Sequence, residues 1–313
     1  MLPLARATRS WVESGLSADE RIDVAETLRG GWTSEMRRLR VSGPGGSRWL
    51  VLRTFSMPFF RKHADGLLSR EAEVLRLLAD TDVPAAELRA VDPTGRDCDH
   101  PSLLMTMLPG CVRLDDEGAL ERSELLAEML VRIHRVPVDG RTRPRSYQAW
   151  TSPERVQIPE STPRPELWRR AVDLIRRDPP AYSGCFLHRD FHPGNVLWDG
   201  PAEELRVSGV VDWVETSWGP ADLDVAHCST ALALLHGVET GMSFACQYLE
   251  AGGTLTDDPS AHLYWRLLDA LAFAPEAEKV TGPWRELGRT DLTPAVVSLR
   301  LEDYVQALVE RCR

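Results

Sequence analysis

The sequence predicts an α+β fold with two lobes, a small β-rich lobe followed by a larger and mostly helical lobe. Short strand-like runs and one amphipathic helix occupy the first third of the chain, whereas apolar residues recur at helical spacing from about residue 119 onward. The pair Pro109-Gly110 separates these two patterns and is typical of a turn. We therefore expect a first lobe at residues 1–108 and a second at residues 109–313.

Three segments justify the β-rich first lobe. Ser34–Ser42 and Ser47–Phe55 are strand-like runs on either side of a glycine-rich turn, which indicates a β-hairpin. Leu68–Asp80 has apolar residues at helical spacing and charges on its other face, so it is predicted to be an amphipathic helix. Ser102–Gly110 begins with a continuous apolar run, which is typical of a buried strand.

The second lobe is predicted to be helical on each side of a polar motif at Phe186–Gly200. Its first helix is expected at Ala119–Val136, where apolar residues lie at helical spacing. The other segments are expected to be an irregular region with short helices at 137–180, a strand with a polar end at 206–215, and helices over 221–313 with loops at 251–253 and around 281–283.

Composition places the chain among soluble globular proteins. Apolar residues make up 43% and charged residues 27%, and no apolar run approaches the roughly 20 residues that cross a bilayer. No signal-type segment opens the chain and the six cysteines are scattered, so we expect a cytoplasmic protein with free thiols. The net charge of −10 argues against a nucleic-acid partner. The expected partner is a small molecule, with neither nucleic acid nor membrane.

The polar motif has the residue types that phosphoryl transfer requires. Its order is His188-x-Asp190-x-x-x-x-Asn195, and Asp212 follows a later apolar run. Such chemistry needs a carboxylate to orient the attacking hydroxyl, oxygen ligands for Mg²⁺, and positive charge or N–H groups at the phosphates. Asp190 suits the first role, and Asn195 with Asp212 suits the second.

The stretch HRDFHPGN followed by VVDW resembles the catalytic core of the aminoglycoside phosphotransferase and choline kinase-like superfamily. These are small-molecule kinases with a protein-kinase-like fold. The resemblance implies Asp190 as catalytic base and Asn195 and Asp212 as magnesium ligands. It also implies that His188 bonds neighbouring backbone and that Asp224, in WGPADLDVAH, supports the catalytic loop by accepting hydrogen bonds.

The same resemblance implies a nucleotide site in the first lobe. Arg53 stands where protein kinases have a phosphate-binding lysine, and a guanidinium can bind phosphate through two N–H groups. Glu71 is expected to pair with Arg53, with Glu73 on another helix face as its rival. The full implied set is Arg53, Gly31, Thr33 and Ser34 at the phosphates, Glu71 as the residue that orients Arg53, and Thr106 and Met107 at the hinge that binds adenine.

The acceptor site is the least specified part of the sequence. Candidates for acceptor binding are Trp150, His192, Glu215, Asp269 and Glu276, since carboxylates would pair with ammonium groups of a polyamine sugar. Each carboxylate also fits a solvated helix position, and His192 also fits a role in shaping its loop.

The leading hypothesis is an ATP- or GTP-dependent, Mg²⁺-requiring kinase acting on a hydroxyl of a small molecule. An antibiotic acceptor (aminoglycoside, macrolide or peptide), phosphorylated for resistance or self-protection, is the first choice. A metabolite such as a sugar, choline or homoserine is the second. The protein is expected to be a monomer or homodimer.

Two other functions compete with the kinase hypothesis. The first is a metal-dependent hydrolase, because His188, Asp190 and His192 are residues that zinc accepts. The chain offers no second histidine cluster at suitable spacing, since His134, His227 and His236 sit in helical patterns and are expected to be packing or surface residues. The second is a non-catalytic nucleotide-binding module, which the presence of Asp190, Asn195 and Asp212 disfavours.

Overall fold

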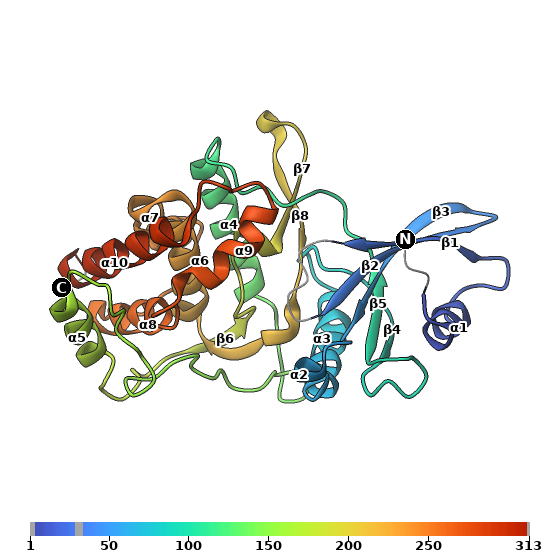
Figure 1. Ribbon diagram of the computed structural model, residues 1–313, viewed down its shortest axis with the longest axis horizontal. Helices are drawn as coiled ribbons and strands as arrows, with labels where there is room; N and C mark the ends of the chain where they lie inside the picture. The colour runs from blue at the N-terminus through green and yellow to red at the C-terminus, as the bar shows by residue number, and fades with distance from the viewer. Residues whose placement is uncertain (1–3, 29–33, 312–313) are drawn as a thin grey trace. The chain divides into compact units, whose positions relative to one another are not determined.

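The computed structural model describes residues 4–28 and 34–311 (Figure 1). The chain forms two compact units, one of Met1–Pro109 with Ser208–Glu215 and one of Gly110–Val207 with Thr216–Arg313. The first is built on an antiparallel sheet and the second is mostly helical, so the predicted α+β class is confirmed. The sequence-based division has a single boundary near residue 109, whereas Ser208–Glu215 packs with the first unit in the structure.

The first unit has a five-stranded antiparallel sheet with strand order β1-β2-β3-β5-β4. One apolar cluster lies on the face of the sheet that carries Leu39, Leu50 and Leu104. Leu103, on the opposite face, is also fully buried. The strands are β1 (Arg21–Leu28), β2 (Glu35–Gly43), β3 (Gly46–Thr54), β4 (Leu88–Asp92) and β5 (Ser102–Thr106), and the helices are α1 (Arg6–Ser14), α2 (Pro58–Arg61) and α3 (Ala64–Leu78).

The hairpin predicted from the glycine-rich turn is confirmed. Strands β2 and β3 pair in antiparallel register, with Gly43 opposite Gly46. Pro44 and Gly45 form the two-residue connection, and Gly46 has a φ of 107°, a backbone conformation that favours glycine. The long register carries Arg53 at the far end of β3, opposite Met36.

Helix α3 presents one carboxylate to the interior and another to solvent. Leu68, Glu71 and Leu75 are buried and lie on one helical face at spacings of three and four residues. Glu73 is exposed. The interior position therefore belongs to Glu71, the residue that the sequence favours as the partner of Arg53.

The second unit is a helical assembly that also contains short strands: β6 pairs with β9 in antiparallel register, and β7 pairs with β8. The predicted helix at 119–136 is present as α4. In chain order the elements are α4 (Ala119–His134), α5 (Pro165–Leu174), β6 (Gly184–Leu187), η1 (Pro193–Asn195), β7 (Val196–Asp199), η2 (Ala202–Glu204), β8 (Arg206–Val210), η3 (Trp213–Glu215), β9 (Ser217–Pro220), α6 (Ala221–His236), α7 (Val238–Glu250), α8 (Pro259–Leu271), η4 (Ala277–Val280), α9 (Thr281–Glu286) and α10 (Pro294–Arg311), with β8 leading the chain into the first unit and η3 lying there.

Helix α6 is the centre of the second unit. Every residue from Asp222 to Leu235 is buried, and α4, α7, α8 and α10 pack around the helix. A helix that is apolar on all sides is typical of such a position. Its polar residues Asp224 and His227 therefore need partners, because burying an unpaired polar group is costly.

One prediction for the helical region is wrong. The loop expected around residues 281–283 is instead the first turn of α9. Proline fits there because the first N–H groups of a helix have no partner within the helix. The Thr281 hydroxyl also donates a hydrogen bond to the carbonyl of Glu278 and closes the turn.

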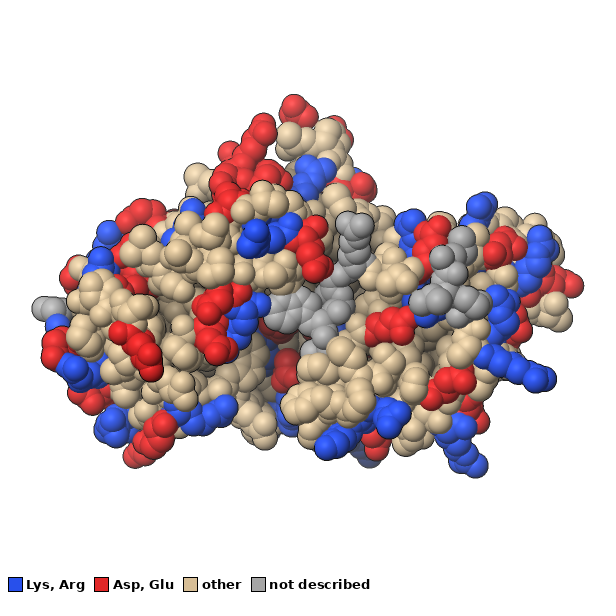
Figure 2. All heavy atoms as spheres, viewed as in Figure 1, with Lys and Arg blue, Asp and Glu red and all other residues tan. Residues whose placement is uncertain are grey.

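The surface carries charges of both signs. On the face shown in Figure 2, acidic and basic side chains are interspersed. None of the described helices is both long and apolar enough to cross a membrane. The described cysteines, Cys98, Cys111, Cys185, Cys228 and Cys246, are all free thiols.

Candidate active site

The loop of residues 188–195 follows β6 and is fixed to α6 by one carboxylate. The backbone N–H groups of His188 and Arg189 donate hydrogen bonds to Asp224, at 2.8 and 2.9 Å. Arg189 has a φ of 72°, a conformation that is unfavourable for a residue with a side chain. Asp224 thus holds a strained backbone turn directly before Asp190.

Asp224 is itself held on its far side. It is completely buried, and His134 approaches its Oδ2 at 3.3 Å while the other ring nitrogen of His134 lies 2.6 Å from the Tyr248 hydroxyl. Burial raises the pKa of Asp224, but the hydrogen bond and charge of His134 outweigh it and lower the pKa below its usual value. The carboxylate therefore stays ionised and accepts both N–H bonds.

Replacing Asp224 with asparagine is expected to lower the free energy of unfolding by about 1–3 kcal/mol, because one loop N–H would then face an amide NH₂. Urea unfolding followed by circular dichroism measures this loss. Asp257→Asn is the matched control, since Asp257 is exposed and its replacement should stay within about 0.5 kcal/mol. Equal stabilities for the two variants would show that Asp224 does not hold the loop.

Asp190 is oriented by Asn195 from within the same loop. The Asn195 amide nitrogen donates to the Asp190 carbonyl at 2.9 Å and to its Oδ2 at 3.0 Å. These bonds leave the Asn195 Oδ1 oxygen as the amide atom suited to a cation, and amide oxygen is a ligand that Mg²⁺ accepts. The N–H of Asp190 donates to His188 Nδ1 at 3.2 Å, so His188 bonds neighbouring backbone as the resemblance implies.

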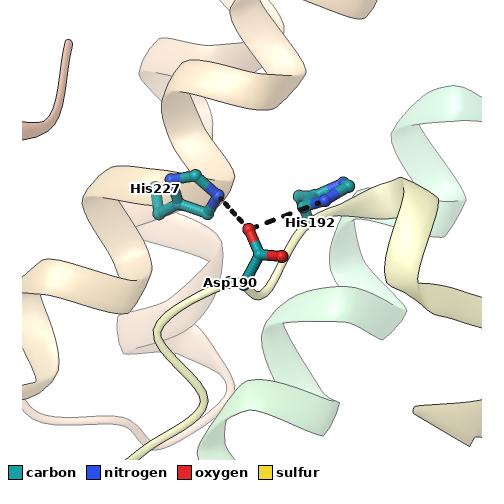
Figure 3. Close-up of side chains that lie close together, drawn as sticks. All are labelled: Asp190, His192 and His227. Carbon is teal, nitrogen blue, oxygen red and sulfur yellow. Dashed lines mark ion pairs between the residues drawn. The ribbon is translucent and has the colours of Figure 1, made fainter. Parts of the chain in front are cut away.

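The structure also brings His227 to Asp190 and places Asp269 on the other side of the His227 ring. The sequence did not indicate a role for His227 in the site. His227 Nε2 lies 3.2 Å from Asp190 Oδ1 (Figure 3). On the other side of the ring, His227 Nδ1 lies 3.1 Å from Asp269 Oδ1. The expectation that His227 only packs or faces solvent is therefore wrong. Its spacing of three residues from Asp224, on one face of α6, was the available signal.

The charges in this chain of three groups support one another. Burial disfavours the imidazolium of His227, but Asp269 and Asp190 outweigh it and raise the pKa of His227 to about 10. Burial likewise raises the pKa of Asp190, and the hydrogen bond from His227 with the charges of His192 and His227 lowers it well below its usual value. Asp190 is therefore ionised near neutral pH.

Asp190, His192 and His227 form a cluster that could in principle bind a metal ion. Ligand atoms of Asp190, His192 and His227 lie within 4.8 Å of one another, a grouping close enough for one ion. However, His192 Nδ1 accepts the N–H of Gly194 at 3.0 Å, so the neutral ring carries its proton on Nε2, toward Asp190. Both nitrogens of His227 face carboxylates. The histidine nitrogens that face Asp190 therefore carry protons, whereas a metal ligand must offer a lone pair. This arrangement disfavours the hydrolase hypothesis.

In the first unit, Arg53 is the centre of a buried ion-pair network. Its Nη1 donates to both carboxylate oxygens of Glu71, at 2.7 and 2.8 Å, and its Nη2 donates to Asp212 Oδ1 at 2.8 Å. Its Nε donates to the Ser34 hydroxyl at 3.1 Å. Burial lowers the pKa of Arg53, but Asp212 and Glu71 outweigh it and raise the pKa above its usual value. Every nitrogen of the guanidinium is thus engaged.

This network explains why Ser208–Glu215 belongs to the first unit. Asp212 binds Arg53, the Val214 carbonyl accepts a hydrogen bond from Arg70, and the Val210 N–H donates to the Pro84 carbonyl. Asp212 has a φ of 68°. Within the described residues it and Arg189 are the two non-glycine residues with positive φ, and such strain concentrates at functional sites.

The remaining candidates for nucleotide binding are Gly31, Thr33, Thr106 and Met107. Gly31 and Thr33 lie outside the described residues. The N–H groups of Thr106 and Met107 donate to the carbonyls of Glu87 and Trp49, so neither is available to an adenine edge in this arrangement.

Of the four acceptor candidates besides His192, Trp150 and Asp269 lie beside His227. The Trp150 ring meets the His227 ring edge to face at 4.8 Å, and Arg189 lies over the same indole at 4.3 Å. Asp269 is buried and bound to His227, so its carboxylate does not face solvent as an ammonium site would. Glu276 is exposed before η4, and Glu215 ends η3 in the first unit.

Comparison with known proteins identifies the family. The model of the APH phosphotransferase enzyme family matches residues 24–265, which is most of the chain. The chain belongs to this family and is a phosphotransferase enzyme, so the resemblance stated from the sequence is confirmed. No curated protein sequence matches it.

Solved structures show the same fold. A protein of Ralstonia eutropha JMP134 assigned to the aminoglycoside phosphotransferases has a TM-score of 0.64 at 18% identity, covering 98% of this chain and 97% of that chain. Aminoglycoside phosphotransferase APH(4)-Ia, as a thermostable mutant with ADP and hygromycin B, has a TM-score of 0.59 at 17% identity, covering 91% and 94%. The macrolide 2′-phosphotransferase MphH of Brachybacterium faecium has a TM-score of 0.52 at 18% identity, covering 90% and 93%. These matches confirm the kinase-like α+β fold.

Proposed function

We propose that the chain is an ATP- or GTP-dependent kinase that requires Mg²⁺ and phosphorylates a hydroxyl of a small molecule. Family membership supports the phosphotransferase class. The observation that carries the proposal is the environment of Asp190, a carboxylate that is 31% exposed, ionised, and fixed by donors to each of its oxygens. Such a group can accept a hydrogen bond from an acceptor hydroxyl and aim its oxygen at the γ-phosphate.

The low pKa of Asp190 makes it a weak base, so we assign it mainly to orientation. The transition state of phosphoryl transfer is loose, and the hydroxyl proton becomes acidic only as the new P–O bond forms. A carboxylate held in one direction then contributes through positioning, where an error of 1 Å costs about a hundredfold in rate. The fixed loop of residues 188–195 meets that requirement.

We assign the magnesium ligands to Asn195 and Asp212. Each offers a hard oxygen, the amide Oδ1 of Asn195 and the carboxylate of Asp212, and this donor chemistry fits Mg²⁺. When bound, the ion supplies positive charge at the phosphate oxygens. Asp212 also binds Arg53 through Oδ1, so a bound ion would share this carboxylate with the guanidinium.

The nucleotide is assigned to the first unit. Arg53, oriented by Glu71 and Ser34, supplies the fixed positive charge for the phosphates. The segment with Gly31 and Thr33 is proposed to add backbone N–H groups. Adenine is assigned to the segment of Thr106 and Met107, through backbone groups other than the two N–H groups already bonded.

For the acceptor we propose an antibiotic, with resistance or self-protection as the role. Structurally similar proteins are named for aminoglycosides and a macrolide, which supports this class. A metabolite hydroxyl is the alternative. The free thiols suit a reducing compartment, so we place the enzyme in the cytoplasm.

A screen of nucleotide consumption tests the proposal. Purified protein is incubated with MgATP or MgGTP and a panel of antibiotics and metabolites, and consumption with a phosphorylated product is expected for one acceptor class. Removal of Mg²⁺ with EDTA should abolish turnover. Tightly bound zinc with phosphoesterase activity and no nucleotide consumption would refute the kinase proposal and support the hydrolase.

A further inference from the structure

We propose that His227 and Asp269 are positioning residues, which hold the Asp190 carboxylate in its working direction through an Asp269–His227–Asp190 chain. The inference deepens the proposed function and rests on Asp190 being the group that orients the acceptor hydroxyl. Neither His227 nor Asp269 is proposed to contact the reacting atoms.

The chain of contacts is built from three separate elements. Asp190 lies on the 188–195 loop, His227 on α6 and Asp269 on α8. His227 Nε2 is 3.2 Å from Asp190 Oδ1 and His227 Nδ1 is 3.1 Å from Asp269 Oδ1. Both His227 and Asp269 are at least 94% buried, so water competes little for these bonds.

Aromatic rings fix the plane of the imidazole. Phe273 stacks on His227 at 6.0 Å with an interplanar angle of 23°, and Trp150 meets it edge to face at 4.8 Å. A ring held on two sides keeps its nitrogens aimed at the two carboxylates. Figure 3 shows the His227 nitrogen pointing to the Asp190 oxygen.

His227 and Asn195 together fix both oxygens of Asp190. His227 donates to Oδ1 from α6, while Asn195 donates to Oδ2 from within the loop. Two donors from different elements allow the carboxylate little rotation. Loss of one would leave the other oxygen bonded but release the carboxylate to turn, which lowers the rate without removing the nucleotide site.

Asp269 stabilises the protonated, positively charged form of His227. Asp269 is buried, and its Oδ2 has no hydrogen-bond partner among the described residues, so His227 is the group that offsets its charge. The ionisable groups that face His227 are Asp190 and His192 from the loop and Asp269 from α8, with Arg189 beyond the Trp150 ring. A cation between two carboxylates is favoured, and His227 therefore donates from both nitrogens.

The charge state of His227 is measured by long-range ¹H–¹⁵N NMR of protein labelled with ¹⁵N-histidine. The His227 signal is identified by its absence in His227→Gln. In the folded protein it should remain doubly protonated above pH 8, because its pKa is raised to about 10 from 6.5. The stabilisation from this group is present below pH 6.5 and is lost as the pH rises through about 10. Asp269→Asn should lower the His227 pKa by about 1–3 units.

The positioning role is measured by MgATP hydrolysis with water as acceptor. His227→Phe should lower kcat by about 10- to 100-fold with an unchanged KM for MgATP. His227→Gln keeps an N–H donor and should retain more activity. His262→Gln is the matched control, because His262 and Asp222 form another His–Asp pair between α8 and α6, at 2.8 Å, and should keep the wild-type kcat.

The outcomes separate this inference from the proposed function. A His227 that titrates near 6.5 in the wild-type protein, or equal losses of kcat in His227→Phe and His262→Gln, would overturn the positioning role. A protein that neither binds nor hydrolyses MgATP or MgGTP would overturn the proposed function instead, and the NMR titration would still decide whether the Asp269–His227–Asp190 chain exists.

Discussion

Replacing Asp190 with asparagine is expected to reduce phosphoryl transfer by about 10²–10⁴-fold while binding of MgATP persists. Asparagine has nearly the same shape, so it keeps the loop packing but presents an NH₂ or a neutral oxygen to the hydroxyl. His227 and Asn195 would then face a neutral amide. Its oxygen can accept a hydrogen bond from one of them, but its NH₂ cannot accept one from the other. Turnover of the acceptor found by screening, with MgATP affinity measured by calorimetry, tests both parts.

The matched control is Asp199→Asn. Asp199 ends β7, nine positions after Asp190, is 41% exposed, and pairs with Arg206 on the surface. Its replacement should change turnover by less than about twofold because exposed ion pairs contribute little. Wild-type turnover in Asp190→Asn would remove Asp190 from the mechanism, and loss of MgATP binding would assign it to nucleotide binding.

Replacing Glu71 with alanine is expected to lower the free energy of unfolding by about 3–5 kcal/mol. Glu71 is 1% exposed and accepts two hydrogen bonds from Arg53, which would then be a buried cation balanced by Asp212 alone. Chemical unfolding monitored by tryptophan fluorescence gives the loss. Nucleotide affinity should fall as well, because Arg53 would lose its fixed direction.

Glu73→Ala on the same helix is the control for this prediction. Glu73 is exposed, so its loss should change stability by no more than about 0.5 kcal/mol. Equal effects of the two substitutions would contradict the buried network. Joint replacement of Arg53 and Glu71 with methionine and leucine should recover part of the stability, since it leaves no unpaired partner between them.

The sequence predicts those features that depend on local pattern. The β2–β3 hairpin follows from its glycine-rich turn, and the buried position of Glu71 follows from helical periodicity in α3. The motif of Asp190 and Asn195 is likewise contiguous, and the resemblance to a known family adds Asp224. These residues need no knowledge of how distant segments pack.

The features that the sequence misses depend on tertiary packing. His227 reaches Asp190 because α6 runs beneath the loop, and Asp269 reaches His227 only because α8 packs on α6. The spacing from Asp224 places His227 on the same face of α6, but the sequence does not tell which carboxylates lie opposite that face. The transfer of Ser208–Glu215 to the first unit depends in the same way on Arg53, which lies far away along the chain.

Helix α6 has a consequence for comparing this enzyme with its relatives. Its Asp224 carboxylate accepts hydrogen bonds from the loop backbone. About one turn later, its His227 imidazole contacts the side chain of Asp190 on the same loop. Inserting or deleting a single residue between them would rotate one relative to the other by about 100°. The three-residue interval is therefore a geometric requirement. A homologue that keeps a histidine three residues after this aspartate should share the arrangement. A homologue without the histidine must orient the residue equivalent to Asp190 through other contacts.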